Sequence, residues 1–360
     1  MGLELTVDGE RWRRHLVEAT RARPGIVPVA KGNGYGFGLG RLARRCAWLA
    51  ERAADTGSAL DLMAVGTYPE VSQVVDRFAG DVMVLTPWRP SGATGADPEP
   101  HGRRVIHTVS RPTDLEDLTT REPGARFVLE QLTSMRRHGM TRHELIEVAR
   151  VIEDRKLPGL CGIAVHLPLN VSSHLAEVRR LLNDVVATGL RTRTVFVSHL
   201  SPAELTALRS EFGDFTIRPR VGTDLWLGDR TALKATATVL DVHPLERGET
   251  FGYRGRSLPR SGHLVIVSGG TAHGIGLEAP LGDQSLRNRA ATIARSGLDA
   301  VGLVRSPFAI DGKQRLFAEP PHMQASMLFV PSGGRVPDVG EDLEVRVRFT
   351  ATSFDRVVVV

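Results

Sequence analysis

Residues 26–40 read IVPVAKGNGYGFGLG, and the interpretation of the rest of the chain starts from this stretch. A short apolar run ends just before a single lysine, Lys31, and five glycines then occupy alternate positions from residue 32 to residue 40. Apolar, β-branched runs of this length favour a strand, and clustered glycines favour a loop. The pattern therefore predicts a strand that leads into a loop with a lysine at its head.

Lysine is rare in this chain, which makes its presence at residue 31 informative. Lysines and arginines together number 46, and only four of them are lysines, at positions 31, 156, 234 and 313. A guanidinium group stays protonated and forms no imine, whereas a desolvated lysine amine can act as a nucleophile or a base. Composition alone is equally compatible with a lysine retained by chance on a solvated loop.

Length and composition limit the kind of protein. A chain of 360 residues exceeds one ordinary core and suggests about two domains. The net charge is +5, but 41 acidic residues are interspersed with the bases and aromatic residues make up only 5%, so a nucleic-acid partner is not expected. Cys46 and Cys161 have no metal-ligand spacing and suggest no disulfide, which fits a reducing cytoplasm. No apolar run is long enough for a membrane span.

Apolar, β-branched runs recur along the first two thirds of the chain, and helical patterns lie between several of them. The helical patterns cover residues 40–54, 141–156 and 201–213, and the last two open with capping-box candidates, Thr141 to Glu144 and Ser201 to Glu204. Eight strands alternating with helices predict a closed (β/α)8 barrel, or TIM barrel, with a doubly wound open sheet as the competing fold. The eight runs are residues 26–30, 62–66, 82–85, 104–109, 126–130, 161–167, 193–199 and 215–222.

The pattern changes after about residue 231. Five strand-like segments follow, separated by glycine and proline turns, and no strong helical period appears. We therefore expect a barrel domain over residues 1–230 and a mostly β domain over residues 231–360. The five segments are residues 235–242, 263–270, 326–330, 343–350 and 356–360.

Polar residues gather where the predicted barrel strands end, which is where such barrels carry their chemistry. Phosphate sites often follow strands seven and eight of a barrel, and Ser201, Gly222 and Thr223 are candidates for one. Each has a simpler alternative: Ser201 as a helix cap alone, Gly222 as a turn residue. The glycine loop lacks both the G-x-G-x-x-G and the Walker patterns, so a nucleotide cradle is not expected. The strand-end residues are Lys31, His166, His199, Ser201, Arg220, Gly222 and Thr223.

A lysine at a strand end, facing a phosphate site across a barrel mouth, is the arrangement expected for pyridoxal 5'-phosphate. The segment PVAKGNGYG from residue 28 resembles the cofactor-lysine motif of alanine racemases, usually written AVVKANAYGHG. The resemblance covers nearly the whole chain. It continues in MRRHGM (135–140), GIAVHL (162–167), RVGTDLWLG (220–228), ALKATATVLDVHPLERGETFGYRG (232–255), VIVSGGTAHGIG (265–276) and PPHMQASM (320–327).

The resemblance implies a racemase that interconverts L- and D-amino acids. It implies a barrel followed by a β domain, in a homodimer whose active sites are shared between the subunits. Lys31 would hold pyridoxal phosphate as a Schiff base and act as one of two acid/base groups. Tyr35 would contact the phosphate, together with Ser201 and the backbone of Gly222 and Thr223.

The resemblance also assigns the remaining barrel residues. Arg220 would face the pyridine nitrogen and keep it unprotonated, with His166 supporting Arg220. Arg137 would lie near the phenolic oxygen of the cofactor and bind substrate. Glu130 occupies the position where many family members have a carbamylated lysine, and an ordinary carboxylate there could orient Arg137. In the β domain, Met323 would line the carboxylate end of the substrate.

The chain departs from the family at the second base. A racemase needs a base on each face of the α-carbon, and the family uses a tyrosine. Here Thr271 takes the tyrosine position and His273 that of a neighbouring aspartate. Threonine is a poor base, whereas a histidine can titrate near neutrality, so His273 is the predicted second base and Thr271 the weaker alternative. Phe354 stands where the family has a phosphate-contacting tyrosine.

Three functions remain compatible with this sequence. The first is an amino-acid racemase with an altered second base. The second is a one-base pyridoxal phosphate enzyme of the same fold, which decarboxylates, transaminates or exchanges a proton stereospecifically. The third is a homologue that binds pyridoxal phosphate without turnover.

Overall fold

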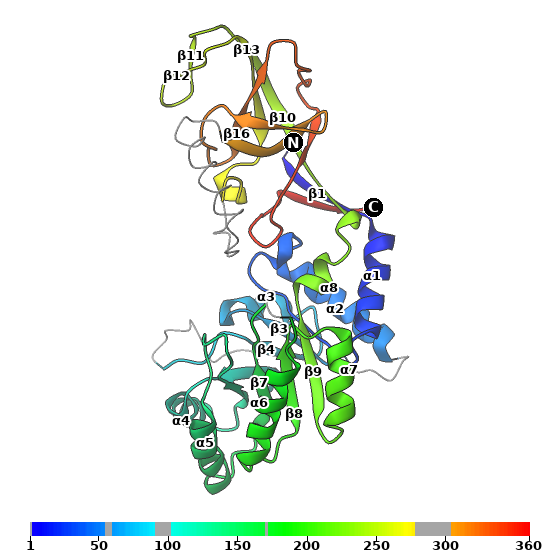
Figure 1. Cartoon of the computed structure of the whole chain (residues 1–360), viewed down its shortest axis with the longest axis vertical. Coiled ribbons are helices and arrows are strands. Elements are labelled where there is room, and N and C mark those ends of the chain that lie inside the picture. The colour runs from blue at the N-terminus through cyan, green and yellow to red at the C-terminus, as the bar shows by residue number, and fades with distance from the viewer. Residues whose placement is uncertain (1, 55–59, 91–101, 170–171, 278–303) are drawn as a thin grey trace. The chain divides into compact units, whose positions relative to one another are not determined.

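The computed structural model describes residues 2–54, 60–90, 102–169, 172–277 and 304–360 (Figure 1). Backbone contacts divide the chain into two compact units. The first, here called the barrel unit, comprises residues 13–34 and 38–228. The second, the β unit, comprises residues 1–12, 35–37 and 229–360.

The barrel unit contains eight parallel strands, as the apolar runs predicted. In hydrogen-bonding order they are β2, β9, β8, β7, β6, β5, β4 and β3. A parallel bridge between Val29 and Ala64 joins the two ends of this order, so the sheet forms a TIM-like barrel. The strands are β2 (Val27–Pro28), β3 (Leu62–Val65), β4 (Asp81–Val84), β5 (Val105–Val109), β6 (Arg126–Gln131), β7 (Leu160–Val165), β8 (Thr194–Ser198) and β9 (Thr216–Val221).

Helices lie outside the barrel strands, and α4 to α7 contact one another in chain order around it (Figure 1). Both predicted capping boxes form, since Thr141 and Ser201 each accept the backbone N–H three residues on. The helices are α1 (Gly9–Arg21), α2 (Leu39–Ala54), α3 (Val71–Val74), α4 (Pro112–Arg121), α5 (Arg142–Asp154), α6 (Leu175–Ala187), α7 (Pro202–Glu211) and α8 (Thr223–Leu227). Short 3-10 turns add η1 (Gly34–Gly36), η2 (Tyr68–Glu70), η3 (Gly102–Arg104), η4 (Arg230–Ala232) and η5 (Thr271–His273).

The barrel strands are buried on both faces, which explains their continuous apolar runs. One set of side chains, including Ala64, Met83 and Phe196, forms a small cluster inside the barrel. The alternate set, including Val109 and Leu129, packs in a larger cluster with helix residues such as Leu181. The strand period of two thus separates an inner core from an outer one.

The β unit is built around the long strand β10 (Leu233–Leu245). Six strands close into a ring, because β10 pairs with β17 on one side and with β13 at the other end of the same series. All five predicted segments form strands. The other strands are β1 (Leu3–Val7), β11 (Thr250–Phe251), β12 (Arg256–Ser257), β13 (Gly262–Ser268), β14 (Arg305–Ile310), β15 (Lys313–Phe317), β16 (Ala325–Pro331), β17 (Asp342–Val345) and β18 (Arg356–Val359).

The N-terminal strand belongs to the β unit, although the sequence predicted that residues 1–230 form the barrel domain. β1 pairs antiparallel with β10 and parallel with β18. Its alternate residues Leu3, Leu5 and Val7 are fully buried. β1 and β10 are far apart in sequence, and they pair because β1 has one apolar face and β10 continues beyond the closed ring. Local periodicity in the sequence cannot reveal this pairing. At the other boundary, the chain passes from one unit to the other between Gly228 and Asp229.

Two features are absent from the described residues. None of their helices combines the length and the apolar character needed to cross a bilayer. They also contain no group of three or more histidine, cysteine, aspartate or glutamate side chains arranged to hold a metal ion.

Candidate active site

Lys31 follows directly on the closure of the barrel. The backbone N–H of Val29 donates to Val221 (2.9 Å) and that of Ala30 to Ala64 (2.8 Å), so this segment lies between the ends of β9 and β3. The indole N–H of Trp226 on α8 donates to the Val29 carbonyl at 2.7 Å and secures it further. Lys31 is therefore the first residue beyond the strand ladder, at the carboxyl ends of the strands.

A hydrogen-bonded turn and one carboxylate shape the start of the glycine loop. Gly34 donates its N–H to the Lys31 carbonyl (3.1 Å), and a β-carbon at Gly34 would lie 2.8 Å from the Leu39 nitrogen. The carboxylate of Glu70 accepts N–H groups from Gly32 (2.9 Å) and Gly66 (2.6 Å). One side chain thus ties the loop after β2 to the loop after β3, and it brings a negative charge close to Lys31.

Positive charges dominate around the Lys31 amine. Lys31 is exposed as a residue, but partial burial of its amine lowers the pKa of Lys31, the guanidinium groups of Arg137 and Arg220 lower it further, and the Glu70 carboxylate opposes them. A lysine whose pKa is lowered has a larger neutral fraction at a given pH and is a better nucleophile and base. The structure therefore gives Lys31 the environment of a reactive amine.

Arg220, at the end of β9, is almost fully buried. Its Nη2 donates to the Val165 carbonyl at 2.9 Å, which joins the ends of β9 and β7. Burial lowers its pKa to about 10, with Glu130 acting in the opposite direction. Its Nε is buried and has no hydrogen-bond partner in the described part of the chain. A buried donor without an acceptor is costly, so this N–H is suited to an acceptor on a bound group.

Glu130 and Arg137 belong to one loop that leaves β6 and returns to it at Met140. Met140 donates its N–H to the Glu130 carbonyl (2.8 Å), which brings the intervening segment back to β6. Burial raises the pKa of Glu130, and Arg220, Arg137 and Arg89 counteract that rise. Among the described residues Glu130 Oε2 has no hydrogen-bond partner, and the carboxylate interacts with Arg137 through charge.

Two histidines complete the mouth of the barrel. His166 follows β7 and His199 follows β8, with ring centroids 5.2 Å apart at 62°. Burial lowers the pKa of His166 to about 3, and the nearby Arg220 and Arg137 contribute to this shift. Burial also lowers the pKa of His199. At neutral pH both rings are therefore uncharged beside the arginines. Arg220 bonds the carbonyl of Val165, the residue before His166, and not the His166 ring.

Ser201, Gly222 and Thr223 lie at the ends of β8 and β9, as predicted. The Ser201 hydroxyl caps α7: it accepts the N–H of Glu204 (3.2 Å) and donates to the Glu204 carboxylate (2.9 Å). Gly222 precedes α8, and Thr223 is its first residue. Ser201 therefore caps α7, and its additional role as a phosphate contact stays a prediction.

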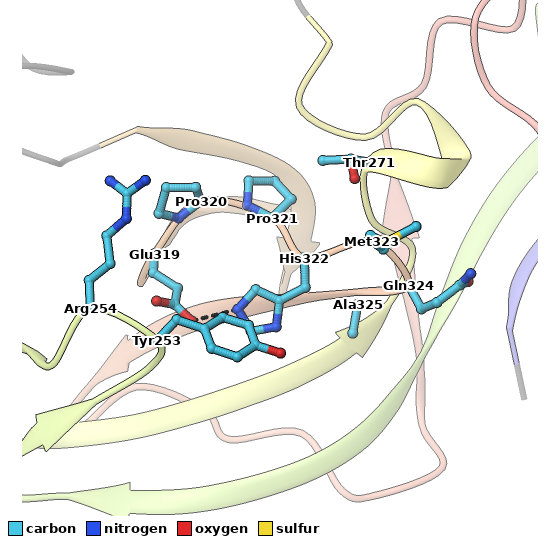
Figure 2. A pocket seen from close by; sticks show the side chains of 10 residues that line it. All are labelled: Tyr253, Arg254, Thr271, Glu319, Pro320, Pro321, His322, Met323, Gln324 and Ala325. Atoms are coloured by element: carbon cyan, nitrogen blue, oxygen red, sulfur yellow. Dashed lines mark hydrogen bonds and ion pairs between the residues drawn. The ribbon is translucent and has the colours of Figure 1, made fainter.

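The remaining predicted residues belong to the β unit. Tyr35 is buried with a φ of 56°, which is uncommon for a non-glycine residue. Phe354 packs on the backbone nearby, since a β-carbon at Gly36 would lie 2.8 Å from its ring. Thr271 and Met323 line one cleft of about 700 Å³, shown in Figure 2.

His273 does not line that cleft. Its ring is buried, Nδ1 accepts the Gly270 N–H (3.2 Å), and Nε2 lies 3.0 Å from the Asp355 carboxylate. Both ring nitrogens are thereby engaged within the protein. Its role as second base stays a prediction, and this geometry argues against it.

Four residues of these sites escaped the sequence prediction: Glu70, Tyr253, Glu319 and His322. Glu70 has no motif around it, and its partners come from two separate loops. His322 stood beside Met323 in the quoted segment PPHMQASM, and Tyr253 stood in the GYRG turn. Only the fold reveals that these segments share one cleft.

The sequence model for "Alanine racemase, N-terminal domain" matches residues 10–227, which is more than half of the chain. The chain belongs to the alanine racemase family. Among curated proteins no sequence matches it significantly.

Solved alanine racemases share the fold of this family member over its whole length. The Bartonella henselae alanine racemase, solved with covalently bound pyridoxal phosphate, is 17% identical with a TM-score of 0.68, and all of each chain is covered. The enzyme from D-cycloserine-producing Streptomyces lavendulae is 18% identical with a TM-score of 0.66, covering 100% of this chain and 97% of that one. At this identity the likeness establishes the architecture and not the substrate.

The charge environment of Lys31 leads to a first prediction for this racemase-family protein. Arg137→Ala removes a positive charge that lowers the Lys31 pKa, so that pKa should rise and the amine should become nucleophilic only at higher pH. Glu70→Gln removes a negative charge and should shift the profile to lower pH. The measurement is the rate of Lys31 acetylation against pH in cofactor-free protein, followed by peptide mass spectrometry.

Arg136→Ala is the matched control, since this exposed neighbour of Arg137 is not among the charges that act on Lys31. Its profile should coincide with that of the wild type. Equal profiles for Arg137→Ala and Arg136→Ala would contradict the proposed charge effect.

Proposed function

We propose that this protein is a pyridoxal phosphate-dependent amino-acid racemase that uses Lys31 as its cofactor-binding lysine. The observation that carries the proposal is the Lys31 amine, whose pKa is lowered at the carboxyl ends of the barrel strands. Family membership and the solved neighbour with covalently bound pyridoxal phosphate support it. The same placement explains why this position needs a lysine in a chain that otherwise uses arginine.

The residues present fit the cofactor. The buried Nε–H of Arg220 has no acceptor among the described residues. The pyridine nitrogen of the cofactor can accept a hydrogen bond and would satisfy this donor. Because Arg220 remains protonated at neutral pH, it would donate to that nitrogen and keep it unprotonated. Phosphate would be held by the hydroxyls of Tyr35 and Ser201 and by the backbone of Gly222 and Thr223. When bound, pyridoxal phosphate stabilises negative charge at the α-carbon of an amino acid.

The chain's own residues would bind the substrate and move its α-proton. Lys31 would attach the cofactor and then carry a proton on one face of the α-carbon, which its lowered pKa favours. Arg137 would bind the substrate and the phenolic oxygen of the cofactor, while the neutral His166 supports the arginines without adding charge. Met323 would line the carboxylate end of the substrate, and Thr271 or His273 would serve the opposite face.

A second candidate function is a one-base pyridoxal phosphate enzyme, such as a decarboxylase or a stereospecific exchange catalyst. The observation in its favour is Thr271, a threonine at the position of the expected tyrosine. A homologue that binds the cofactor without turnover is the third possibility. The three differ in what happens to the α-proton.

Lys31→Arg tests the cofactor assignment. Borohydride reduction of wild-type protein with pyridoxal phosphate should fix the cofactor on the Lys31 peptide, and Lys31→Arg should abolish the label because guanidinium forms no imine. Lys313→Arg is the control and should label normally. A label on Lys156, Lys234 or Lys313 in the wild type would overturn the assignment.

Exchange in heavy water separates the three functions. A panel of L- and D-amino acids should gain deuterium at the α-carbon with inversion if the protein is a racemase. Exchange with retention, or loss of carbon dioxide, would instead favour the one-base enzyme. An absence of any exchange, with Lys31 still labelled, would favour the silent homologue.

The phosphate contacts generate a third prediction. Tyr35→Phe and Ser201→Ala should each weaken pyridoxal phosphate binding by about 1–3 kcal/mol, the cost of losing a hydrogen bond to a charged group. Ser201→Ala should also lower the free energy of unfolding by about 1 kcal/mol, because the cap is lost. Thr141→Ala is the control: it removes the equivalent cap from α5 and should lower stability without changing cofactor affinity. If Ser201→Ala behaves like Thr141→Ala, Ser201 is only a cap.

We also propose a cytoplasmic homodimer in which the β unit of one subunit completes the active site of the other. Light scattering of purified protein should give twice the chain mass, and dilution below the dimer dissociation constant should abolish racemisation. A monomer with full activity would contradict shared sites.

A further inference from the structure

The cleft of the β unit contains a histidine–carboxylate pair that the family resemblance did not assign. Figure 2 shows His322 and Glu319 joined by a hydrogen bond, with the Tyr253 ring beside them. The cleft brings this pair together with two residues singled out from the sequence, Thr271 and Met323.

Backbone pairing fixes His322 directly opposite Thr271. Thr271 donates its N–H to the His322 carbonyl (2.8 Å), and Ala272 donates to the Met323 carbonyl (3.0 Å). The two segments approach closely at Gly270, where a β-carbon would lie 2.1 Å from the His322 carbonyl oxygen. Residue 271, where the family has a tyrosine, therefore lies beside His322 in the backbone pairing.

Glu319 fixes the direction of the His322 ring. His322 Nε2 lies 2.5 Å from Glu319 Oε1, and when this carboxyl group is ionised it can only accept, so Nε2 then carries the hydrogen. The Glu319 side chain is itself only 2% exposed and packs on Gly252, where a β-carbon would lie 2.3 Å from Oε2. A carboxylate fixed in this way orients the ring.

The other ring nitrogen belongs to a side chain that is partly exposed. His322 Nδ1 has no hydrogen-bond partner among the described residues, and the side chain is 29% exposed. With the hydrogen on Nε2, Nδ1 keeps its lone pair and can accept a proton. The exposed Tyr253 ring lies on one side, with its centroid 4.6 Å from that of the histidine. By contrast, His273 has both nitrogens engaged with Gly270 and Asp355.

We propose that His322, oriented by Glu319, is the second acid/base residue of the racemisation and replaces the tyrosine that is absent at Thr271. The inference rests on the proposed function. Nδ1 would take the α-proton of one enantiomer while the electron pair of the broken C–H bond stays on the α-carbon. Lys31 would then deliver a proton to the opposite face. In the reverse direction the two residues exchange tasks, and no oxidant or reductant is required.

His322→Ala tests the proposal by separating inversion from exchange. In heavy water it should slow inversion by about 100-fold or more, the usual size of a general acid/base contribution. Exchange with retention should persist, because Lys31 can take a proton and return it on one face. Added imidazole should restore part of the inversion in His322→Ala and none in Lys31→Arg. His322→Gln keeps a polar side chain of similar length and provides the same test should the alanine variant fold poorly.

A second readout needs neither cofactor nor turnover. Nitrogen-15 NMR of the cofactor-free protein should show the His322 ring with its hydrogen on Nε2. Glu319→Gln should shift the ring toward the Nδ1–H tautomer, because an amide can donate to Nε2, and it should slow inversion while exchange with retention persists. A purely structural histidine would show no such link between tautomer and inversion.

The outcomes distinguish this proposal from the function on which it rests. Inversion at the wild-type rate in His322→Ala, or a wild-type ring with its hydrogen on Nδ1, would overturn the role of His322 and leave the racemase intact. Loss of inversion in His273→Ala but not in His322→Ala would assign the role to His273. Absence of exchange in the wild type would overturn both the proposed function and this inference.

Discussion

Closure of the barrel at β2 is the constraint on which the candidate site depends. The strand is short, yet the next two residues stay paired: Val29 bonds to Val221 and Ala30 to Ala64. These bonds fix the backbone up to the residue before Lys31. The Lys31 side chain is consequently attached next to hydrogen-bonded strand backbone and not to the middle of a loop. Functional side chains are positioned more precisely on such regular elements than on loops.

Charge crowding is the second determinant of the barrel mouth. Lys31, Arg137 and Arg220 act on one another at short range, and only Glu70 and Glu130 oppose them in the interactions described above. Neutral histidines add donors and acceptors to this region without further charge. The positive charges of Arg137, Arg220 and protonated Lys31 repel one another, and a bound anionic ligand would reduce this repulsion.

The sequence predicted what depends on neighbours along the chain and missed what depends on tertiary contacts. Strand periodicity and capping boxes are local, so the barrel strands and the starts of α5 and α7 were correctly predicted. The pairing of β1 and the bonds of Glu70 join distant segments and leave no local signal. For His273 and His322 the residue type was visible, but which ring nitrogen remains accessible depends on Asp355 and Glu319.

Pairing between the first and last strands has a consequence for biosynthesis. β1 is synthesised before the barrel strands, but its parallel partner β18 is synthesised after all of them. Domains that are continuous in sequence can fold as they are synthesised, and nearly all of the barrel unit is continuous. The β unit, in contrast, can reach its complete hydrogen-bonded state only after β18 has been synthesised, so a chain truncated before β18 would retain an unpaired strand edge.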